Sequence, residues 1–269
     1  MTVDIQQNFV YVSGLGMVAP GFSDEQQITS ILSGETKWQF SELQKLLPTC
    51  LPANERRRTT TTIKLAIQVA QLALQMETPL LSPATVFASS DGDFSIVDRI
   101  CSELCEENKN VSPTQFHNSV HNAPAGYWAI AAKCQLPSTS ISAGDATFAA
   151  GLLEAMTQVQ LTQQPVLFVA YDVPAPFPLD EKRHFEFAFG VAMLLTANAQ
   201  ADSRAQISYI KIDDVAASCC EAKELAAMQN GNPIANSLPL LESIYRGYSK
   251  RIFFPYYDQR TLGVEVNHD

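Results

Sequence analysis

Charged side chains are scarce in this sequence of 269 residues, and the basic ones are scarcer than the acidic ones. Only 17% of the residues are charged, whereas soluble domains average about 25%. Lysine and arginine number 18 against 28 aspartates and glutamates, so the net charge is −10. General nucleic-acid binding is excluded, because it needs a basic surface that displaces counterions from phosphates. Since a lone protein usually covers itself with charged residues, their scarcity suggests that a partner covers part of the surface.

The sequence also lacks a long hydrophobic run and a dense set of cysteines. No apolar stretch approaches the ~18 residues that a membrane-spanning helix needs, which excludes membrane insertion. The opening MTVDIQQNF has no basic segment followed by an apolar one, so it does not resemble a secretory signal. Six cysteines are too few for a disulfide scaffold, and we expect reduced thiols in a cytoplasmic protein. The apolar fraction of 46% excludes disorder and predicts a single domain over residues 1–269.

Hydrophobic patterning predicts strands that alternate with helices. Near-continuous apolar runs over residues 165–170 and 191–196 are typical of strands buried on both faces. The alternation indicates an α/β layered fold with a mainly parallel, covered sheet. The glycines of Gly14-Leu15-Gly16 predict a turn after the first strand. The other expected strands cover residues 9–13, 86–88, 138–142 and 207–212, and the expected helices cover residues 24–32, 60–76, 94–107, 116–132 and 146–159.

Four residues are spaced almost as in a two-cysteine, two-histidine zinc site, namely Cys101, Cys105, His117 and His121. However, they lie inside a patterned α/β domain of an acidic chain, and Val111-Ser112-Pro113 separates two helices instead of leading into one. We therefore expect buried thiols and hydrogen-bonded imidazoles, and no metal. One zinc ion per purified chain would contradict this interpretation.

Other catalytic motifs are missing. The sequence has no Gly-x-Ser-x-Gly elbow and no glycine-rich phosphate loop followed by Lys-Ser or Lys-Thr. Gly14-Leu15-Gly16 lacks the third glycine of a dinucleotide-binding loop, so no cofactor is expected. The four histidines are too scattered to predict a triad: His268 lies at the extreme C-terminus, and His184 belongs to a polar segment that indicates a solvated loop.

The strongest signal is a strand, a turn and a helix of small residues over LPSTSISAGDATFAAGLLEA, residues 136–155. The chain turns through Ala143-Gly144, which places Asp145 at a helix N-terminus. Unpaired N–H groups and the helix dipole favour a negative charge there. In a thiol enzyme the same position lowers the pKa of a cysteine and makes it a nucleophile.

This segment resembles the nucleophile region of β-ketoacyl synthases, the condensing enzymes of fatty-acid and polyketide synthesis. Pro137-Ser138-Thr139-Ser140 leads to Asp145, where that family carries its acyl-accepting cysteine. The opening VYVSGLGMVAPG of residues 10–21 is similar to the family's first strand and turn. Arg57 with the helix over residues 62–74, and AGYWAIA over residues 125–131, also fit in order and spacing.

The resemblance covers about residues 8–215. It implies a thiolase-like layered fold with a covered sheet and a buried central helix, in which the C-terminal half, from about residue 216 to 269, is divergent and shortened. Two departures imply the absence of condensing activity. A carboxylate at position 145 is a weak nucleophile towards a thioester, and no Gly-His or His-Gly-Thr segment follows residue 215 to supply the family's catalytic histidines.

The resemblance is strongest to the short inactive subunits, similar to chain length factors, of bacterial aryl polyene pigment systems. It implies a heterodimer with an active ketosynthase, transient contact with an acyl carrier protein, and a structural Asp145 that caps its helix. A malonyl-thioester decarboxylase with Asp145 as general base, or a homodimeric scaffold or binding protein, remain alternatives. The implied interface or tunnel residues are Phe116, His117, His121, Ser138, Thr139, Ser140, Ile141 and Phe148; the alternative is that they are simply core residues of a domain that has lost its chemistry.

Overall fold

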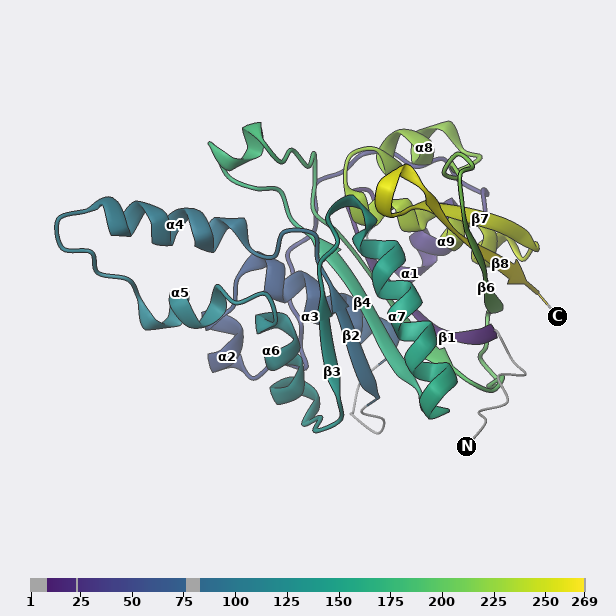
Figure 1. Cartoon of the computed structure of the whole chain (residues 1–269), viewed down its shortest axis with the longest axis horizontal. Coiled ribbons are helices and arrows are strands. Elements are labelled where there is room, and N and C mark those ends of the chain that lie inside the picture. The colour runs from purple at the N-terminus through teal and green to yellow at the C-terminus, as the bar shows by residue number, and fades with distance from the viewer. Residues whose placement is uncertain (1–8, 23, 76–82, 269) are drawn as a thin grey trace.

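The computed structural model describes residues 9–22, 24–75 and 83–268. Its strands form one sheet in the order β3-β2-β4-β5-β1-β6-β8-β7 (Figure 1). The strands are β1 (Phe9–Val18), β2 (Ala84–Ala88), β3 (Ser138–Ile141), β4 (Val166–Asp172), β5 (Phe189–Thr196), β6 (Ala205–Asp213), β7 (Lys250–Pro255) and β8 (Thr261–Asn267).

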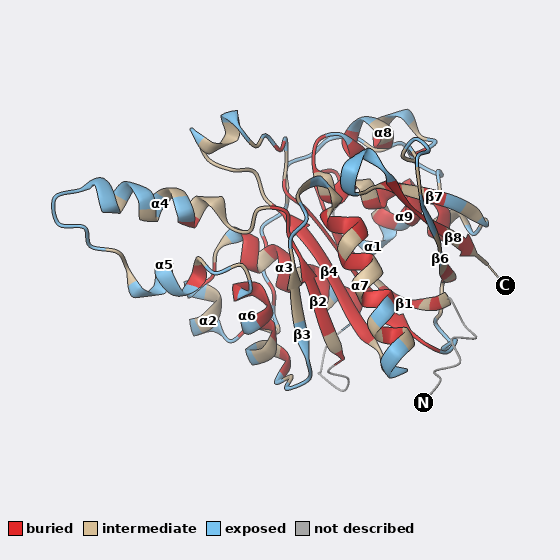
Figure 2. Cartoon of the chain, viewed as in Figure 1, coloured by how far each residue is buried: buried red, intermediate tan, exposed pale blue. Residues whose placement is uncertain are grey.

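Helices cover both faces of this sheet, as the layered α/β prediction requires. α7 (Thr147–Thr162) shares one apolar core with α1 (Glu25–Leu32) and α9 (Leu238–Arg246), while α3 (Thr61–Ala73) and α6 (Ala123–Ala132) belong to the core on the other face. Every residue of β4 is buried between them (Figure 2). The remaining helices are α2 (Ala53–Arg58), α4 (Phe94–Cys105), α5 (Pro113–Asn118) and α8 (Lys223–Gln229), with 3-10 turns η1 (Gly144–Ala146), η2 (Leu179–Glu181), η3 (Pro233–Ser237) and η4 (Tyr257–Gln259).

The directions of the strands differ from the prediction of a mainly parallel sheet. Only β3, β2 and β4 run parallel to one another, and each of the other neighbouring pairs among the described strands is antiparallel. A continuous apolar run reports burial on both faces, and the helices of both layers supply that burial whichever way the strands run. The pattern therefore indicated the covering helices and not the strand direction.

The predicted turn at Gly14-Leu15-Gly16 is also wrong, because β1 continues through it to Val18. A β-carbon added at Gly14 would lie 2.1 Å from the carbonyl oxygen of Ala73, and one at Gly16 would lie 2.4 Å from that of Val69. Both carbonyls belong to α3. The glycines therefore allow α3 to lie directly on the strand, which is a use of glycine inside a strand.

The helix predicted over residues 116–132 is divided in two. α5 ends at Asn118, and Pro124 lies in the first turn of α6, where the missing proline N–H costs no hydrogen bond. α4 and α5, with the connection between them, project from the body as an arm of residues 94–118 (Figure 1). In α4 only Ile96 is buried. The predicted helix over 60–76 is confirmed as Thr61–Ala73, and residue 76 lies outside the described residues.

The C-terminal part, which the resemblance predicted to be divergent and shortened, joins the same sheet. β8 pairs with β6, and β7 forms the edge beyond it. Phe254 of β7 reaches α7, where its ring centroid lies 5.1 Å from that of Phe148. Within the described residues, no helix is long and apolar enough to cross a membrane.

Candidate functional site

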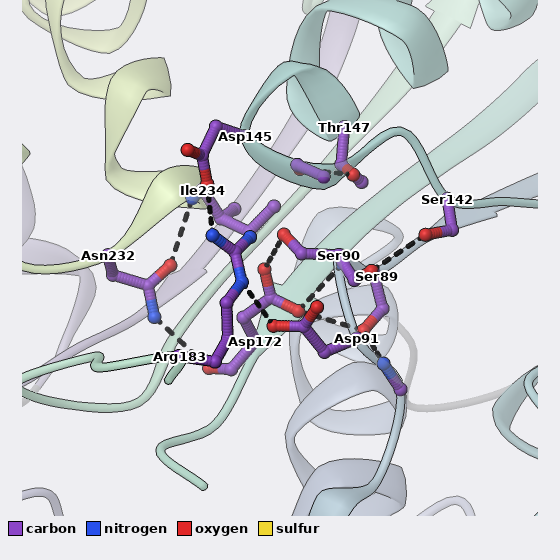
Figure 3. Close-up of polar contacts among 12 residues, drawn as sticks. Ser89, Ser90, Asp91, Ser142, Asp145, Thr147, Asp172, Arg183, Asn232 and Ile234 are labelled. Carbon is purple, nitrogen blue, oxygen red and sulfur yellow. Dashed lines mark hydrogen bonds and ion pairs between the residues drawn. The ribbon is translucent and has the colours of Figure 1, made fainter. Parts of the chain in front are cut away.

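The carboxyl ends of the three parallel strands meet at one end of the sheet and carry a cluster of polar side chains (Figure 3). Ser89, Ser90 and Asp91 follow β2, Ser142 follows β3, and Asp172 is the last residue of β4. The N-terminus of α7 with Asp145 lies beside them (Figure 3). Parallel strands place their carboxyl ends at a common edge, which is where sites form in open α/β sheets.

Asp172 is the buried centre of this cluster, with only 1% of its surface exposed. Its Oδ1 accepts hydrogen bonds from Ser89 Oγ at 2.8 Å and from the backbone N–H of Ser90 at 2.9 Å, and its Oδ2 accepts one from Ser90 Oγ. Burial raises the pKa of Asp172 to about 7, although these hydrogen bonds act to lower it. The carboxyl group thus holds the turn after β2 against the end of β4.

Arg183 makes the second set of contacts and lies in the β4–β5 loop, residues 173–188. Its Nε donates to Asp91 Oδ2 at 2.7 Å and its Nη1 to Asp145 Oδ1 at 2.6 Å. Burial lowers the pKa of Arg183, but the two carboxylates outweigh it and raise the pKa above its usual value. The side chain of Asp91 is 18% exposed and that of Asp145 is 69% exposed. The pair with Asp91 is therefore the better shielded of the two.

Asp145 lies at the start of α7, as predicted, but it does not cap this helix. No side-chain cap forms at the helix N-terminus, and the carboxylate of Asp145 points to Arg183. Thr147 stabilises the turn, because its Oγ1 accepts from the N–H of Ala143 at 2.9 Å and donates to the carbonyl of Gly144 at 2.7 Å. The capping role expected for Asp145 is therefore wrong, and the buried Thr147 holds the turn before the helix instead.

A cavity of about 400 Å³ opens beside Asp145 and Arg183. His184, which the sequence assigned to a solvated loop, is exposed as expected and lines this cavity. The lining of this cavity is also rich in side-chain amides. The amides belong to Gln229, Asn230, Asn232 and Asn236.

β3 is the outermost strand at this end of the sheet, and its outer edge is open. The carbonyls of Pro137 and Ile141 accept hydrogen bonds from the N–H groups of Thr85 and Ser89 on the β2 side. Since alternate residues of a strand direct their backbone groups to opposite sides, Ser138 and Ser140 direct theirs outward. Among the described residues, no backbone hydrogen bond is made on that outer side. Ser138 is exposed, while Thr139, Ser140 and Ile141 are half-buried.

The other predicted interface or tunnel residues lie in three different environments. Phe116 is 67% exposed on the arm. His117 is also exposed and contacts the ring of Tyr127 edge-on. His121 lies just after the arm, with its Nε2 2.9 Å from the carbonyl oxygen of Ser89. Phe148 is buried in the core, with its ring 5.5 Å from that of Phe168 between ring centroids.

The cysteines and histidines with zinc-like spacing are not gathered into a site. Cys101 and Cys105 are exposed on α4, which contradicts the expectation of buried thiols there. Their helix has a single buried residue because the arm projects from the body. Of the two imidazoles, His121 is hydrogen-bonded as expected. In the described residues, no three His, Cys, Asp or Glu side chains are grouped so that they could hold a metal ion.

Asp172, Asp91 and Arg183 were not singled out from the sequence. A signal for two of them exists: Asp172 ends an apolar strand, and Asp91 lies in the polar turn after another, so both fall where strand ends converge. Arg183 offers no such signal, because its partners are 38 and 92 positions away in the chain.

Comparisons with known proteins agree with this architecture. A chain in the complex of the ketosynthase ApeO with its chain length factor ApeC from Xenorhabdus doucetiae matches with a TM-score of 0.72 and 24% identity, covering 96% of this chain and 99% of that one. A chain of the ishigamide ketosynthase/chain length factor matches with a TM-score of 0.70 and 11% identity, covering 97% and 99%. A chain of the AntDE:AntF complex, a type II polyketide ketosynthase with its acyl-carrier protein, matches with a TM-score of 0.73 and 12% identity, covering 98% and 100%.

These likenesses show the thiolase-like ketosynthase fold that the sequence predicted. No curated protein matches the chain. The family described as "Beta-ketoacyl synthase, N-terminal domain" matches residues 34–251, which extends the predicted resemblance well beyond residue 215. With most of its length matched, the chain belongs to the β-ketoacyl synthase family.

Proposed function

We propose that this chain is a non-catalytic subunit, similar to a chain length factor, that pairs with an active β-ketoacyl synthase in a type II polyketide system. In this role it shapes the tunnel for the growing acyl chain, and the acyl carrier protein contacts the pair transiently. We further propose that the product is an aryl polyene. We also propose that residues 216–268 belong to the same single domain, which is supported by β7 and β8, the strands that extend its one sheet.

The observation that carries the proposal is the open edge of β3. An unpaired strand edge is a template for a second strand, and natural proteins cover or disrupt such edges unless a partner pairs with them. Ser138 and Ser140 leave their outward backbone groups available on this edge. Exposed apolar side chains lie near it: Leu136, directly before β3, is 52% exposed, and Ile130 on the neighbouring α6 is 53% exposed. Such a surface is typical of a protein–protein interface.

The chemistry around Asp145 supports a non-catalytic role. Attack of a carboxylate on a thioester would form a mixed anhydride, which lies uphill. Asp145 is also held in an ion pair with Arg183, which lowers its nucleophilicity further. Of the four histidines, His117 and His121 lie on or beside the arm, His268 lies at the end of β8, and only His184 lines the cavity.

Co-expression with the ketosynthase encoded beside this chain tests the proposal. Light scattering should show a stable one-to-one complex, and condensing activity should depend on the cysteine of the partner alone. A chain that stays apart from every synthase of its gene cluster, or that forms only homodimers, would contradict the proposal.

A second candidate is decarboxylation of a malonyl thioester, because Asp145 and His184 line the same cavity. Asp145 would serve as the general base. The isolated chain should then release carbon dioxide from malonyl carrier protein, and Asp145→Asn should abolish the release. Equal release by both proteins, or none by either, would exclude this candidate.

A further inference from the structure

The arm, residues 94–118, has little contact with the body, so its orientation depends on its two ends. Its C-terminal end is tied by the buried Asn118, whose Nδ2 donates to the carbonyl of Arg58 at 2.8 Å and whose Oδ1 accepts from Tyr127 Oη at 3.0 Å. His121 adds the contact with the carbonyl oxygen of Ser89. This end is therefore fixed by hydrogen bonds to the end of α2, to the buried Tyr127 of α6 and to the turn after β2.

The N-terminal end of the arm leaves the body through the turn Ser89–Asp93. Asp172 holds the first part of this turn from the end of β4, and Asp93 caps α4 by accepting from the N–H of Ile96 at 3.2 Å. Asp91, between them, is held by Arg183. Arg183 thus connects the root of the arm to the β4–β5 loop and, through Asp145, to the start of α7.

We propose that Arg183 is a positioning residue that sets the orientation of the arm by holding Asp91. Its planar guanidinium can direct separate N–H groups to two carboxylates at once, which a lysine ammonium cannot do with the same geometry. Because Asp91 is largely shielded from water, loss of Arg183 leaves a poorly solvated carboxylate at the arm's root. The turn must then move to hydrate that carboxylate, and the arm moves with it.

The consequence for assembly rests on the proposed function. Phe116 and Val120 lie on or beside the arm and are 67% and 49% exposed. If the arm contacts the synthase, Arg183 presents these side chains in the orientation in which they bind. An arm that is free to move must lose that freedom on binding, which weakens the complex.

Hydrogen–deuterium exchange of the full-length isolated chain tests the positioning role separately from assembly. In Arg183→Gln, amides of residues 94–105 should exchange about tenfold faster, while those of β4 and β5 keep their protection. The matched control is Arg204→Gln: Arg204 is similarly exposed, pairs with the single carboxylate of Glu25, and lies away from the arm. An unchanged arm in Arg183→Gln, or an equal change in the control, would overturn the proposal.

Asp91→Asn is the second variant, because it removes the shielded carboxylate and leaves Arg183 paired with Asp145. It should loosen the arm less than Arg183→Gln does, because no poorly solvated carboxylate is left behind, and the double variant should behave like Asp91→Asn alone. Additive effects, or a double variant as loose as Arg183→Gln, would contradict the mechanism. Asp145→Asn should leave the arm unchanged, since Asp145 is the exposed partner.

Binding to the neighbouring synthase is then measured for the same variants. Arg183→Gln should weaken the complex about tenfold and Arg204→Gln should not. If the wild-type chain binds no synthase, the proposed function fails while the exchange result still decides the role of Arg183. If the wild type binds and a loosened arm binds equally well, the consequence for assembly fails.

Discussion

The two edges of the sheet, β7 and β3, differ in whether the chain itself forms hydrogen bonds with their outward backbone groups. At the β7 edge the chain covers itself: the N–H of Ser218 donates to the carbonyl of Phe253 at 2.8 Å, and Ser218 Oγ accepts from the N–H of Phe253 at 3.0 Å. At the β3 edge, the described residues supply no such cover. The chain bonds its own β7 edge at Phe253, while the described residues leave the β3 edge open to a second chain, which is how a sheet can be stable alone and still associate specifically.

The regions next to the two edges also differ in how their charged groups are buried and paired. Glu242 lies behind β7 with 1% exposure, accepts from the N–H of Glu221 at 2.8 Å, and pairs with Arg246 at 2.8 Å. Near β3 lie the arm and the polar cluster around Asp172. In this cluster, side chains from different loops bind one another through hydrogen bonds and ion pairs. The charged group behind β7 is buried and paired within the core, whereas the loops near β3 are held together by a few hydrogen bonds and ion pairs.

The largest expected effect is on the open edge. Ser140→Pro removes an outward N–H from β3, a position where the isolated chain makes no backbone hydrogen bond and tolerates proline. We expect the isolated chain to fold and its pairing with a synthase to weaken by more than about a thousandfold, which exceeds about 4 kcal/mol. Ser140→Val, which keeps the N–H, is the control. Calorimetric titration measures both, and equal affinities would show that β3 does not pair.

The next effect is on the pH dependence of stability. Because folding raises the pKa of Asp172 to about 7 from an ordinary value of 3.8, the folded chain binds this proton more tightly than the unfolded chain. Its contribution to stability is complete below about pH 4 and is lost as the pH rises through about 7, by about 4 kcal/mol at most.

Asp172→Asn stays neutral and should remove this loss, so that urea unfolding at pH 5 and pH 8 gives more similar free energies than in the wild type. Asp214→Asn, at an exposed carboxylate, should keep the wild-type slope. A slope that survives in Asp172→Asn would assign the pH dependence to another group.

A smaller effect is expected behind the β7 edge. Glu242→Gln keeps the shape of the side chain but removes the charge that Arg246 and two backbone N–H groups face, and it should cost about 3 kcal/mol of unfolding free energy. Glu265→Gln, in the exposed pair with Arg251, should cost less than about 0.5 kcal/mol. Pairing with a synthase should be unaffected by both, and a loss of pairing in Glu242→Gln would mean that the two sides are coupled.

The smallest effect concerns the cover of β7 itself. Ser218→Ala removes the acceptor for the N–H of Phe253 and should lower the unfolding free energy by about 1 kcal/mol. Thermal unfolding and gel filtration should show a slightly weaker monomer. If this variant associated with itself, the serine would be protecting the edge as well as stabilising it.

Local patterns predicted the parts of the fold that depend on neighbours in sequence. The apolar run over 165–170 predicted β4, and the small residues after Ala143-Gly144 predicted the buried α7. The patterns gave a wrong prediction where an element far away in the sequence determines the local structure. Gly14 and Gly16 predict a turn in isolation, yet the close approach of α3 keeps them in a strand. Arg183 belongs to a polar loop in sequence, and only the folded chain brings Asp91 and Asp145 to it.

The contact between His121 and the carbonyl of Ser89 brings the two ends of the arm close together beside the sheet. When both ends of a segment lie close together, a change in the length or sequence of that segment has little effect on the rest of the fold. Evolution can therefore lengthen, shorten or rewrite this segment without altering the strands beneath it. Relatives with the same sheet should differ most in the arm. Proteins with similar scaffolds can acquire different binding specificities by changing this one segment.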